Sequence, residues 1–182
     1  LCEGASTEQA CAVAERLSRR LAQHNPALSW MPASLMASRG DRDEALALCR
    51  TAAQAGGNPA DLHQASRIAL EVAVASRALD STLNRADEVL AEALRHAPSD
   101  DDLLVMKALI SHLQGRFDEE VRLYRIVLKN QPRNDVVLNN LAYALSEGLD
   151  KPSEALEKIN ELITLTGGRN PEFLDTRGVI LM

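Results

Sequence analysis

A leucine recurs about every 34 residues along much of this chain, at Leu70, Leu104, Leu138 and Leu174, each time early in a segment with helical spacing. Other positions repeat in the same register: Val74, Ala108, Ala142 and Gly178, then Leu94 and Leu128, then Pro98 and Pro132. A repeat of this length is typical of stacked helical hairpins, because each hairpin leaves an apolar face that only a neighbouring hairpin can bury. The repeat therefore favours a binding protein over an enzyme.

Composition restricts the fold class. Hydrophobic residues make up 46% of the 182-residue chain, and aromatic residues only 3%. The core must therefore close mainly through Ala, Leu, Val and Ile, which let helices approach closely and suit a β-sandwich poorly. We expect an all-α fold.

The formal charge of −6 argues against a nucleic-acid partner, because phosphate binding requires clustered Lys and Arg. The short basic run Arg16, Arg19 and Arg20 fits the solvent-facing side of one amphipathic helix. No stretch approaches the ~20 apolar residues that a membrane span needs. We expect a soluble protein with the cytoplasm as its default compartment, and Leu1 at the start indicates a processed product or an excised fragment.

The cysteines and histidines predict neither a metal site nor a cofactor. Cys2, Cys11 and Cys49 have no CxxC spacing, and we interpret those within helical segments as buried free thiols. The four histidines are scattered, and none stands at a ligand spacing from another His or Cys.

Capping residues, prolines and glycines predict where the helices begin and end. The patterns include Ser6 with Gln9, Asp41 with Glu44, Asn58-Pro59 and Asn170-Pro171. The expected helices are 7–24, a short one after Pro32, one between Asp41 and Gly56-Gly57, then 59–79, 82–96, 101–114, 117–130, 135–147, 152–165, and a last one from 171 onward.

Residues 101–134 resemble the tetratricopeptide repeat, a helix-turn-helix unit of ~34 residues, through Leu104, Ala108, Gly115, Phe117, Tyr124 and Pro132. The resemblance implies a right-handed α-solenoid that is truncated at both ends. Its parts would be an N-terminal helix (1–25), a degenerate repeat (26–66), repeats 67–100, 101–134 and 135–170, and the first helix of an incomplete repeat (171–182). Departures from the pattern are Glu120, in place of a small Ala, and Lys107 and Arg177, in place of Leu.

In proteins of this family, the first helices of successive units line a concave groove that holds a peptide. By register, we expect the groove to contain Glu71, Asp102, Val105, Leu109, His112, Asn139, Tyr143 and Asp175, with Ile68, Ala75 and Val136 on the same face. Val105, Leu109 and Val136 have an equal claim to the core between repeats. Tyr143 has an equal claim to a place over the core with its hydroxyl in water, and the sequence favours a contact with a neighbouring helix over a peptide contact for Asn139 and Asn140. Because the surface is apolar with acidic flanks, the expected ligand is a neutral to basic peptide or protein.

One subtype of the family is excluded by its residues. Members that grip the acidic tails of heat-shock chaperones use Lys, Asn and Arg on three first helices to hold a carboxylate. The matching positions here are Glu71, Ala75, Met106, Glu172 and Thr176, or, one unit along, Val105, Leu109 and Asn140. Only Asn140 fits that pattern.

The sequence contains no motif for catalysis or phosphate binding, and the one acidic cluster, Asp100 to Asp102, stands where carboxylates stabilise a helix start. The function expected is a protein-interaction scaffold without enzymatic activity. The alternatives are self-assembly through the exposed last helix, Val179 to Met182, or a regulatory arm of a larger enzyme.

Overall fold

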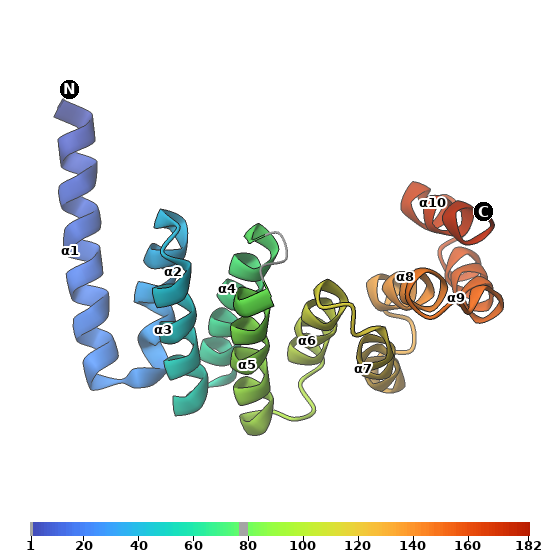
Figure 1. Cartoon of the computed structure of the whole chain (residues 1–182), viewed down its shortest axis with the longest axis horizontal. Helices are drawn as coiled ribbons and strands as arrows, with labels where there is room; N and C mark the ends of the chain where they lie inside the picture. The colour runs from blue at the N-terminus through green and yellow to red at the C-terminus, as the bar shows by residue number, and fades with distance from the viewer. Residues whose placement is uncertain (1, 77–79) are drawn as a thin grey trace. The chain divides into compact units, whose positions relative to one another are not determined.

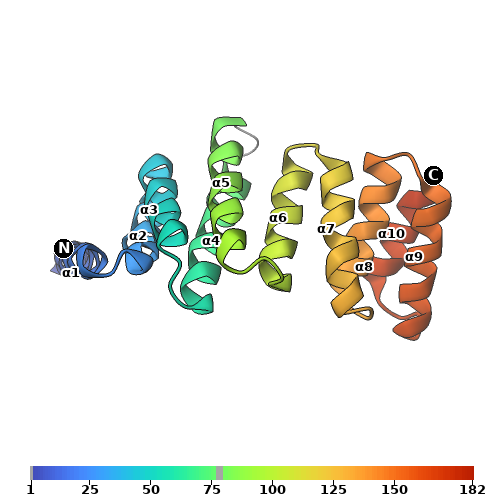
Figure 2. The same ribbon diagram turned by 90° about the horizontal axis from the view of Figure 1, so that it is seen from below.

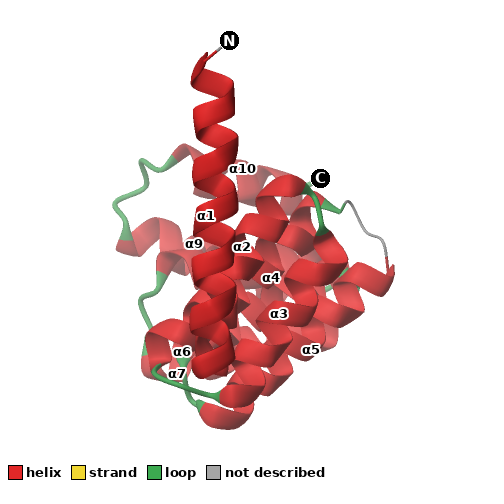
Figure 3. Ribbon diagram, turned by 90° about the vertical axis from the view of Figure 1, so that its left-hand side faces the viewer, coloured by secondary structure: helices red, strands yellow, loops and turns green. Residues whose placement is uncertain are grey.

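The computed structural model describes residues 2–76 and 80–182, with side chains from residue 12 onward. Every regular element in these residues is helical, and they contain no strand (Figure 3). The chain divides into two compact units, Leu1–Leu103 and Leu104–Met182, and the boundary falls within helix α6 (Asp101–Leu113). The all-α fold class is therefore confirmed.

The first unit consists of successive helices (Figure 1). They are α1 (Cys2–His24), a 3-10 turn (Pro26–Ser29), α2 (Trp30–Arg39), α3 (Arg42–Ala55), α4 (Pro59–Ala75) and α5 (Asp80–His96). Each helix from α2 to α5 packs against the next, and in addition α2 contacts α4 and α3 contacts α5. First helices therefore lie against first helices and second helices against second helices, which is the packing of stacked hairpins.

Small residues let the helices of this unit approach closely. Helix α3 buries Ala45, Cys49, Ala52 and Ala53 together with Leu46. The Cys49 thiol is free, and burial raises its pKa to about 12, so it is an inert core residue as the sequence predicts. The side chains of Cys2 and Cys11 lie outside the described residues.

The second unit repeats the same arrangement (Figure 2). After α6 come α7 (Phe117–Asn130), α8 (Asp135–Tyr143), a π-helical turn (Ala144–Gly148), α9 (Pro152–Leu165) and α10 (Pro171–Ile180). Helix α8 packs against both α7 and α9, and α10 packs against both α9 and α8. The first helices α8 and α10 are thus direct neighbours within this unit.

The caps predicted from Asn-Pro pairs are confirmed. The Asn58 side chain accepts a hydrogen bond from the Asp61 backbone N–H at 3.0 Å, and Asn170 does the same for Glu172 at 3.0 Å. Gly56 and Gly57, which end α3, have φ of 78° and 82°, values that favour glycine over any residue with a side chain. Local capping chemistry sets these helix ends.

Two other predicted caps are wrong, although α3 begins at Arg42, directly after Asp41, as the sequence predicts. The Asp41 side chain makes no cap hydrogen bond, because Gly40 in the left-handed conformation already turns the chain into α3. Ser6 lies inside α1, which begins at Cys2, so the capping box with Gln9 does not start that helix.

Three helices also differ in extent from the sequence-based boundaries. Helix α2 begins at Trp30 and holds Pro32 in its first turn, where a missing N–H is tolerated. The helix expected at 135–147 is α-helical only to Tyr143. Helix α4 ends at Ala75, and residues 77–79 of its predicted range lie outside the described residues.

Candidate functional site

The side chains of His112 on α6 and Tyr143 on α8 meet on the first-helix surface of the second unit. Their ring centroids are 6.1 Å apart. Tyr143 ends an α8 stripe that begins at Val136, with the side chains 40% and 58% exposed. Residues seven apart lie on the same side of a helix, so this stripe is a continuous, partly apolar strip beside α6.

A cavity of about 110 Å³ opens beside these rings, between α6, α7 and α8. It is lined by Leu109, His112, Glu120, Tyr124, Asn140 and Tyr143. The structure therefore brings together three of the residues that the sequence predicts for the groove, Leu109, His112 and Tyr143. The other three lining residues were not predicted there, and the one signal for them was the departure of Glu120 from the repeat pattern.

Glu120 is a buried carboxylic acid at this cavity, with only 2% of the residue exposed. Its Oε2 lies 3.1 Å from Nδ1 of His112, so one proton is shared between the two side chains. Burial raises the pKa of Glu120, although the charge and hydrogen bond of His112 act in the opposite direction. Protonation of Glu120 is thus set by the residues around the cavity.

Tyr124 and Asn140 complete the buried part of the lining. The Tyr124 hydroxyl is fully buried and accepts a hydrogen bond from Nδ2 of Asn140 at 3.4 Å. Burial, together with the negative charge of Glu120, raises the pKa of Tyr124, so this phenol stays neutral. The buried part of the lining therefore consists of a carboxyl, a hydroxyl and a carboxamide group.

Asn139 lies next to this group on α8. Its Oδ1 is buried without a hydrogen-bond partner, a state that in the described residues it shares only with Oγ of Ser66. A buried acceptor without a partner costs about 1–3 kcal/mol. Asn139 therefore carries a buried acceptor that no group of the described residues satisfies.

The first unit carries its own hollow on its first helices. This hollow of about 300 Å³ lies between α2 and α4 and is lined by Ser34, Ala37, Ser38, Arg42, Ile68, Glu71, Val72 and Ala75. Glu71 is exposed and paired with Arg67 at 2.5 Å. The expectation that Ile68 lies on the exposed face is wrong: it is 1% exposed, because that side of α4 packs against its neighbours.

The remaining predicted groove residues occupy different settings. Val105 is half-buried on α6, which agrees neither with a fully exposed groove residue nor with a fully buried core residue. Asp175 is exposed on α10. Asp102 is exposed, and its carboxylate lies within 4.8 Å of ligand atoms of His63 and Asp100.

The group of His63, Asp100 and Asp102 has the donor types of a divalent-cation site, but His63 and Asp100 already have structural partners. Nε2 of His63 lies 2.9 Å from Oδ2 of Asp100, whose other oxygen accepts from the Leu103 backbone N–H at 3.0 Å. The prediction that carboxylates stabilise this helix start is confirmed. Sequence spacing missed His63 because 37 residues separate it from Asp100.

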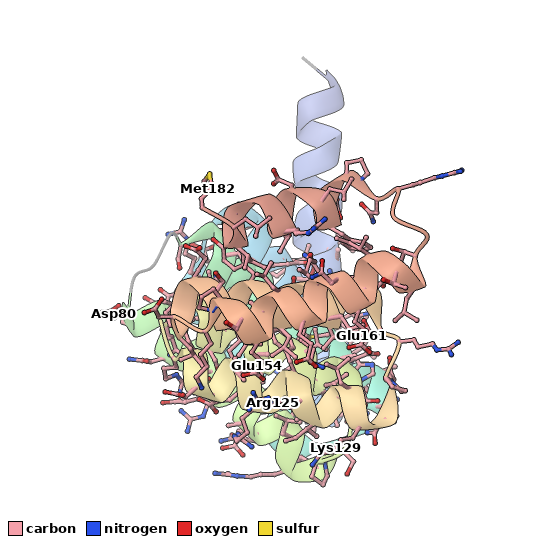
Figure 4. The ribbon with its side chains drawn as sticks, turned by 90° about the vertical axis from the view of Figure 1, so that its right-hand side faces the viewer. Asp80, Arg125, Lys129, Glu154, Glu161 and Met182 are labelled. Atoms are coloured by element: carbon pink, nitrogen blue, oxygen red, sulfur yellow. The ribbon has the colours of Figure 1, made fainter. Side chains whose placement is uncertain are left out.

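In the second unit, the second helices α7 and α9 present a surface of paired charges (Figure 4). Arg125 on α7 forms an ion pair with Glu154 on α9, and Lys158 pairs with Glu161 at 3.3 Å. Beyond them, Met182 projects from the end of α10 and is fully exposed, whereas Ile180 is buried. Only part of the predicted C-terminal apolar patch is therefore accessible.

Among the helices that the structure describes, none combines the length and the apolar character that crossing a bilayer requires.

Comparison with solved structures agrees with this packing. MamA from Desulfovibrio magneticus RS-1, residues 41 to the end, aligns over 92% of this chain and 92% of its own, with a TM-score of 0.63 and 14% identity. A tetratricopeptide repeat protein from Parabacteroides merdae ATCC 43184 aligns over 96% of this chain and 66% of its own, with a TM-score of 0.55 and 15% identity. No protein-family model matches the sequence, and no curated protein is similar to it. The chain therefore has the fold of the tetratricopeptide-repeat-like helical solenoids, as the spacing of its leucines predicts.

Proposed function

We propose that this chain is a protein-interaction scaffold, and that α6 and α8 hold a peptide segment of the partner against Leu109, His112, Asn139 and Tyr143. The observation that carries the proposal is the meeting of His112 and Tyr143 beside a cavity on the first-helix surface. Aromatic side chains that are partly exposed supply large contact areas at a low cost in conformational entropy.

The surface offers both affinity and orientation. Covering an apolar side chain such as Val136 contributes up to about 1.5–3 kcal/mol when its burial is complete. If the Asn139 side chain rotates, its Oδ1, which is buried without a partner, would accept a backbone N–H of an extended peptide. Exposed carboxylates on first helices, among them Asp175, favour a ligand that is neutral to basic.

The test begins with peptides selected from a random library on the immobilised full chain. Binding of each selected peptide is then measured on the double variant Leu109→Asp, Tyr143→Ala. The matched control is Leu165→Ala, which removes a side chain of similar exposure (46%) from the second helix α9. We expect the double variant to lose at least about tenfold in affinity and the control to lose none. Circular dichroism establishes that both variants remain folded.

Selected peptides that bind the double variant as tightly as the unaltered chain would place the binding surface elsewhere. Peptides that are predominantly acidic would contradict the expected charge of the partner, while leaving a role in interaction intact.

Self-assembly is a second candidate function, supported by apolar side chains exposed at both ends of the described chain. Helix α1 exposes Val13, Leu17 and Leu21, spaced four residues apart on one side, and the chain ends with exposed Leu181 and Met182. Light scattering at increasing concentration tests this candidate. A dimer that Leu17→Asp or Leu181→Asp dissociates would support it, whereas a monomer at all concentrations would exclude it.

A further inference from the structure

Glu120 occupies a position where the repeat pattern places a small residue, and it lines the cavity between α6, α7 and α8. Taking a carboxylate out of water costs several kcal/mol unless opposite charge and hydrogen-bond donors replace the water. His112 supplies one such contact at 3.1 Å. A carboxylate has about four lone-pair positions, so this single contact leaves most of its capacity to accept hydrogen bonds unused.

The two ends of the cavity differ in exposure and in chemistry: the buried base is polar, and the exposed mouth is formed by two rings. At the base lie Glu120 and Tyr124, which are 2% and 0% exposed, with Asn140 bonded to the Tyr124 hydroxyl. At the mouth lie Tyr143 and His112, whose exposed fractions are 40% for the residue and 37% for the side chain. Leu109 supplies an aliphatic wall.

This arrangement of a buried polar base and an exposed aromatic mouth matches a lysine side chain. A lysine ammonium carries three N–H donors and no acceptor, and the buried lining of the cavity contains the Glu120 carboxyl together with the polar side chains of Tyr124 and Asn140. The lysine methylene groups suit the wall of Leu109, and the ring of Tyr143 at the mouth is attractive to a cation. At about 110 Å³, the cavity is well below the ~300–1,000 Å³ typical of small-molecule sites, so it fits the end of one side chain.

We propose that this cavity is the specificity pocket of the peptide-binding surface, and that it takes the ammonium group of a lysine in the partner, with Glu120 as the counter-charge. The inference rests on the proposed function, since the lysine belongs to the peptide held by α6 and α8. An anionic side chain meets the buried carboxyl and is repelled, and a neutral one adds no positive charge to the single contact that His112 makes with it.

The pocket itself is tested with n-butylammonium as the probe, using 1-butanol and butyrate as neutral and anionic matches. NMR titration of the full chain follows the methyl signals of Leu109 and the amide signals around Tyr143. We expect saturable shifts with butylammonium and at least about tenfold weaker responses with the other two compounds. Equal binding of 1-butanol would mean that the pocket recognises the alkyl chain alone and would overturn the proposal.

Variants assign the effect to one carboxyl group. Glu120→Gln removes the charge, and Glu120→Ala restores the small residue of the repeat pattern; each is expected to weaken butylammonium binding about tenfold or more. The control Glu119→Gln makes the same change one residue away on α7, where the carboxylate pairs with Arg116 at 3.0 Å, and is expected to leave binding unchanged. Undiminished binding by a folded Glu120 variant would overturn the proposal.

Selected peptides separate this inference from the proposed function. In a peptide that requires Leu109 and Tyr143, replacing its lysine with norleucine should reduce affinity about tenfold on the unaltered chain and much less on Glu120→Gln. A peptide that requires Tyr143 but tolerates norleucine would retain the binding surface and overturn the lysine pocket. Butylammonium binding that depends on Glu120, in the absence of any peptide bound to α6 and α8, would retain the pocket and overturn the surface.

Discussion

The ring of Phe117 fills the space that a side chain at Gly148 would need: a methyl group added at Gly148 would lie less than 3.0 Å from Cβ, Cγ and Cδ1 of Phe117. Gly148 ends the π-helical turn that follows α8. The same Phe117 ring contacts His112 edge-on, with a centroid distance of 5.7 Å. The absence of a side chain at residue 148 therefore helps to hold His112 in place at the cavity.

We predict that Gly148→Ala destabilises the protein by about 1–3 kcal/mol, because a well-packed ring must move to admit the methyl group. Urea unfolding followed by far-UV circular dichroism measures the loss. The control is Gly178→Ala in α10, where a methyl group would meet no atom within 4 Å. That change should be neutral or stabilising by up to about 1 kcal/mol. Equal destabilisation by both substitutions would contradict the packing argument.

Asp61 joins two helices of the first unit. Its Oδ1 accepts a hydrogen bond from Nε1 of Trp30 at 2.9 Å, and its carboxylate lies in the first turn of α4. We predict that Asp61→Ala costs about 1.5–3 kcal/mol, because a bond to a charged group is lost and the partly buried indole N–H of Trp30 is left without its acceptor. Trp30 is the only tryptophan of the chain, so its fluorescence reports this contact directly, and its emission should change.

Asn58→Ala serves as the matched variant for Asp61→Ala. It removes the side-chain cap of the same helix and is expected to cost about 1 kcal/mol, without altering Trp30 emission. An unchanged Trp30 spectrum in Asp61→Ala would show that the indole hydrogen bond is absent in solution.

Helix positions could be predicted from sequence because their determinants are local. Asn58-Pro59 and Asn170-Pro171 each place a side-chain acceptor and a preset φ within two or three residues of the N–H groups that they serve. The leucine repeat likewise needs only spacing along the chain to predict stacked hairpins. Asp41 shows the limit of such rules, since the conformation of the preceding Gly40 turned the chain without the aspartate side chain.

The cavity could not be predicted in the same way. Its lining depends on which way side chains from three helices point, and register alone placed only Leu109, His112 and Tyr143 on its face. Ile68 was assigned to the exposed face because its position in the repeat is that of a groove residue, yet packing within the first unit buries it. The π-helical turn after Tyr143, which sets the position of Gly148, has no local sequence signature.

The stability of the second unit should depend on the ionisation of Glu120. Burial raises the pKa of this carboxyl in the folded state, so the native protein binds the proton more tightly than the unfolded chain. Its contribution to stability is complete below the ordinary value of 4.5 and is lost as the pH rises through the folded-state pKa. We predict that Glu120→Gln gains stability relative to the unaltered chain as the pH is raised from about 4 to about 8.

Urea unfolding at a series of pH values measures that difference. Of the ionisable groups that face Glu120, His112 on α6 is in direct contact with it, and Tyr124 on α7, whose pKa is raised, stays neutral over this pH range in both proteins. A difference that is constant with pH would mean that Glu120 titrates as it does in the unfolded chain.

The contribution of Glu15 to stability should depend on pH in the opposite direction from that of Glu120. Hydrogen bonds from Arg39 and Arg19 lower the pKa of this carboxyl, with Nη1 of Arg39 at 2.5 Å and Nε of Arg19 at 3.1 Å. Its stabilising contribution is present above the ordinary value of 4.5 and is lost as the pH falls through the folded-state pKa. We predict that Glu15→Gln is destabilising near neutral pH and that the difference disappears on acidification and shrinks in high salt. A difference that persists in acid would contradict the ion-pair assignment.

Two adjacent asparagines on α8 should respond differently to the same substitution. Oδ1 of Asn139 is buried without a partner, whereas Nδ2 of Asn140 donates to the Tyr124 hydroxyl at 3.4 Å. Asn139→Leu removes an unsatisfied acceptor, so it should leave stability unchanged or raise it by about 1 kcal/mol. Asn140→Leu deprives the buried Tyr124 hydroxyl of its donor and should cost about 1–3 kcal/mol.

Urea unfolding compares the stabilities of the two variants, and peptide affinity provides the second measurement. The Asn139→Leu variant should remain fully folded and bind selected peptides more weakly, because the acceptor that it removes serves the ligand. A loss of stability as large as that of Asn140→Leu, with peptide affinity unchanged, would assign Asn139 to the core.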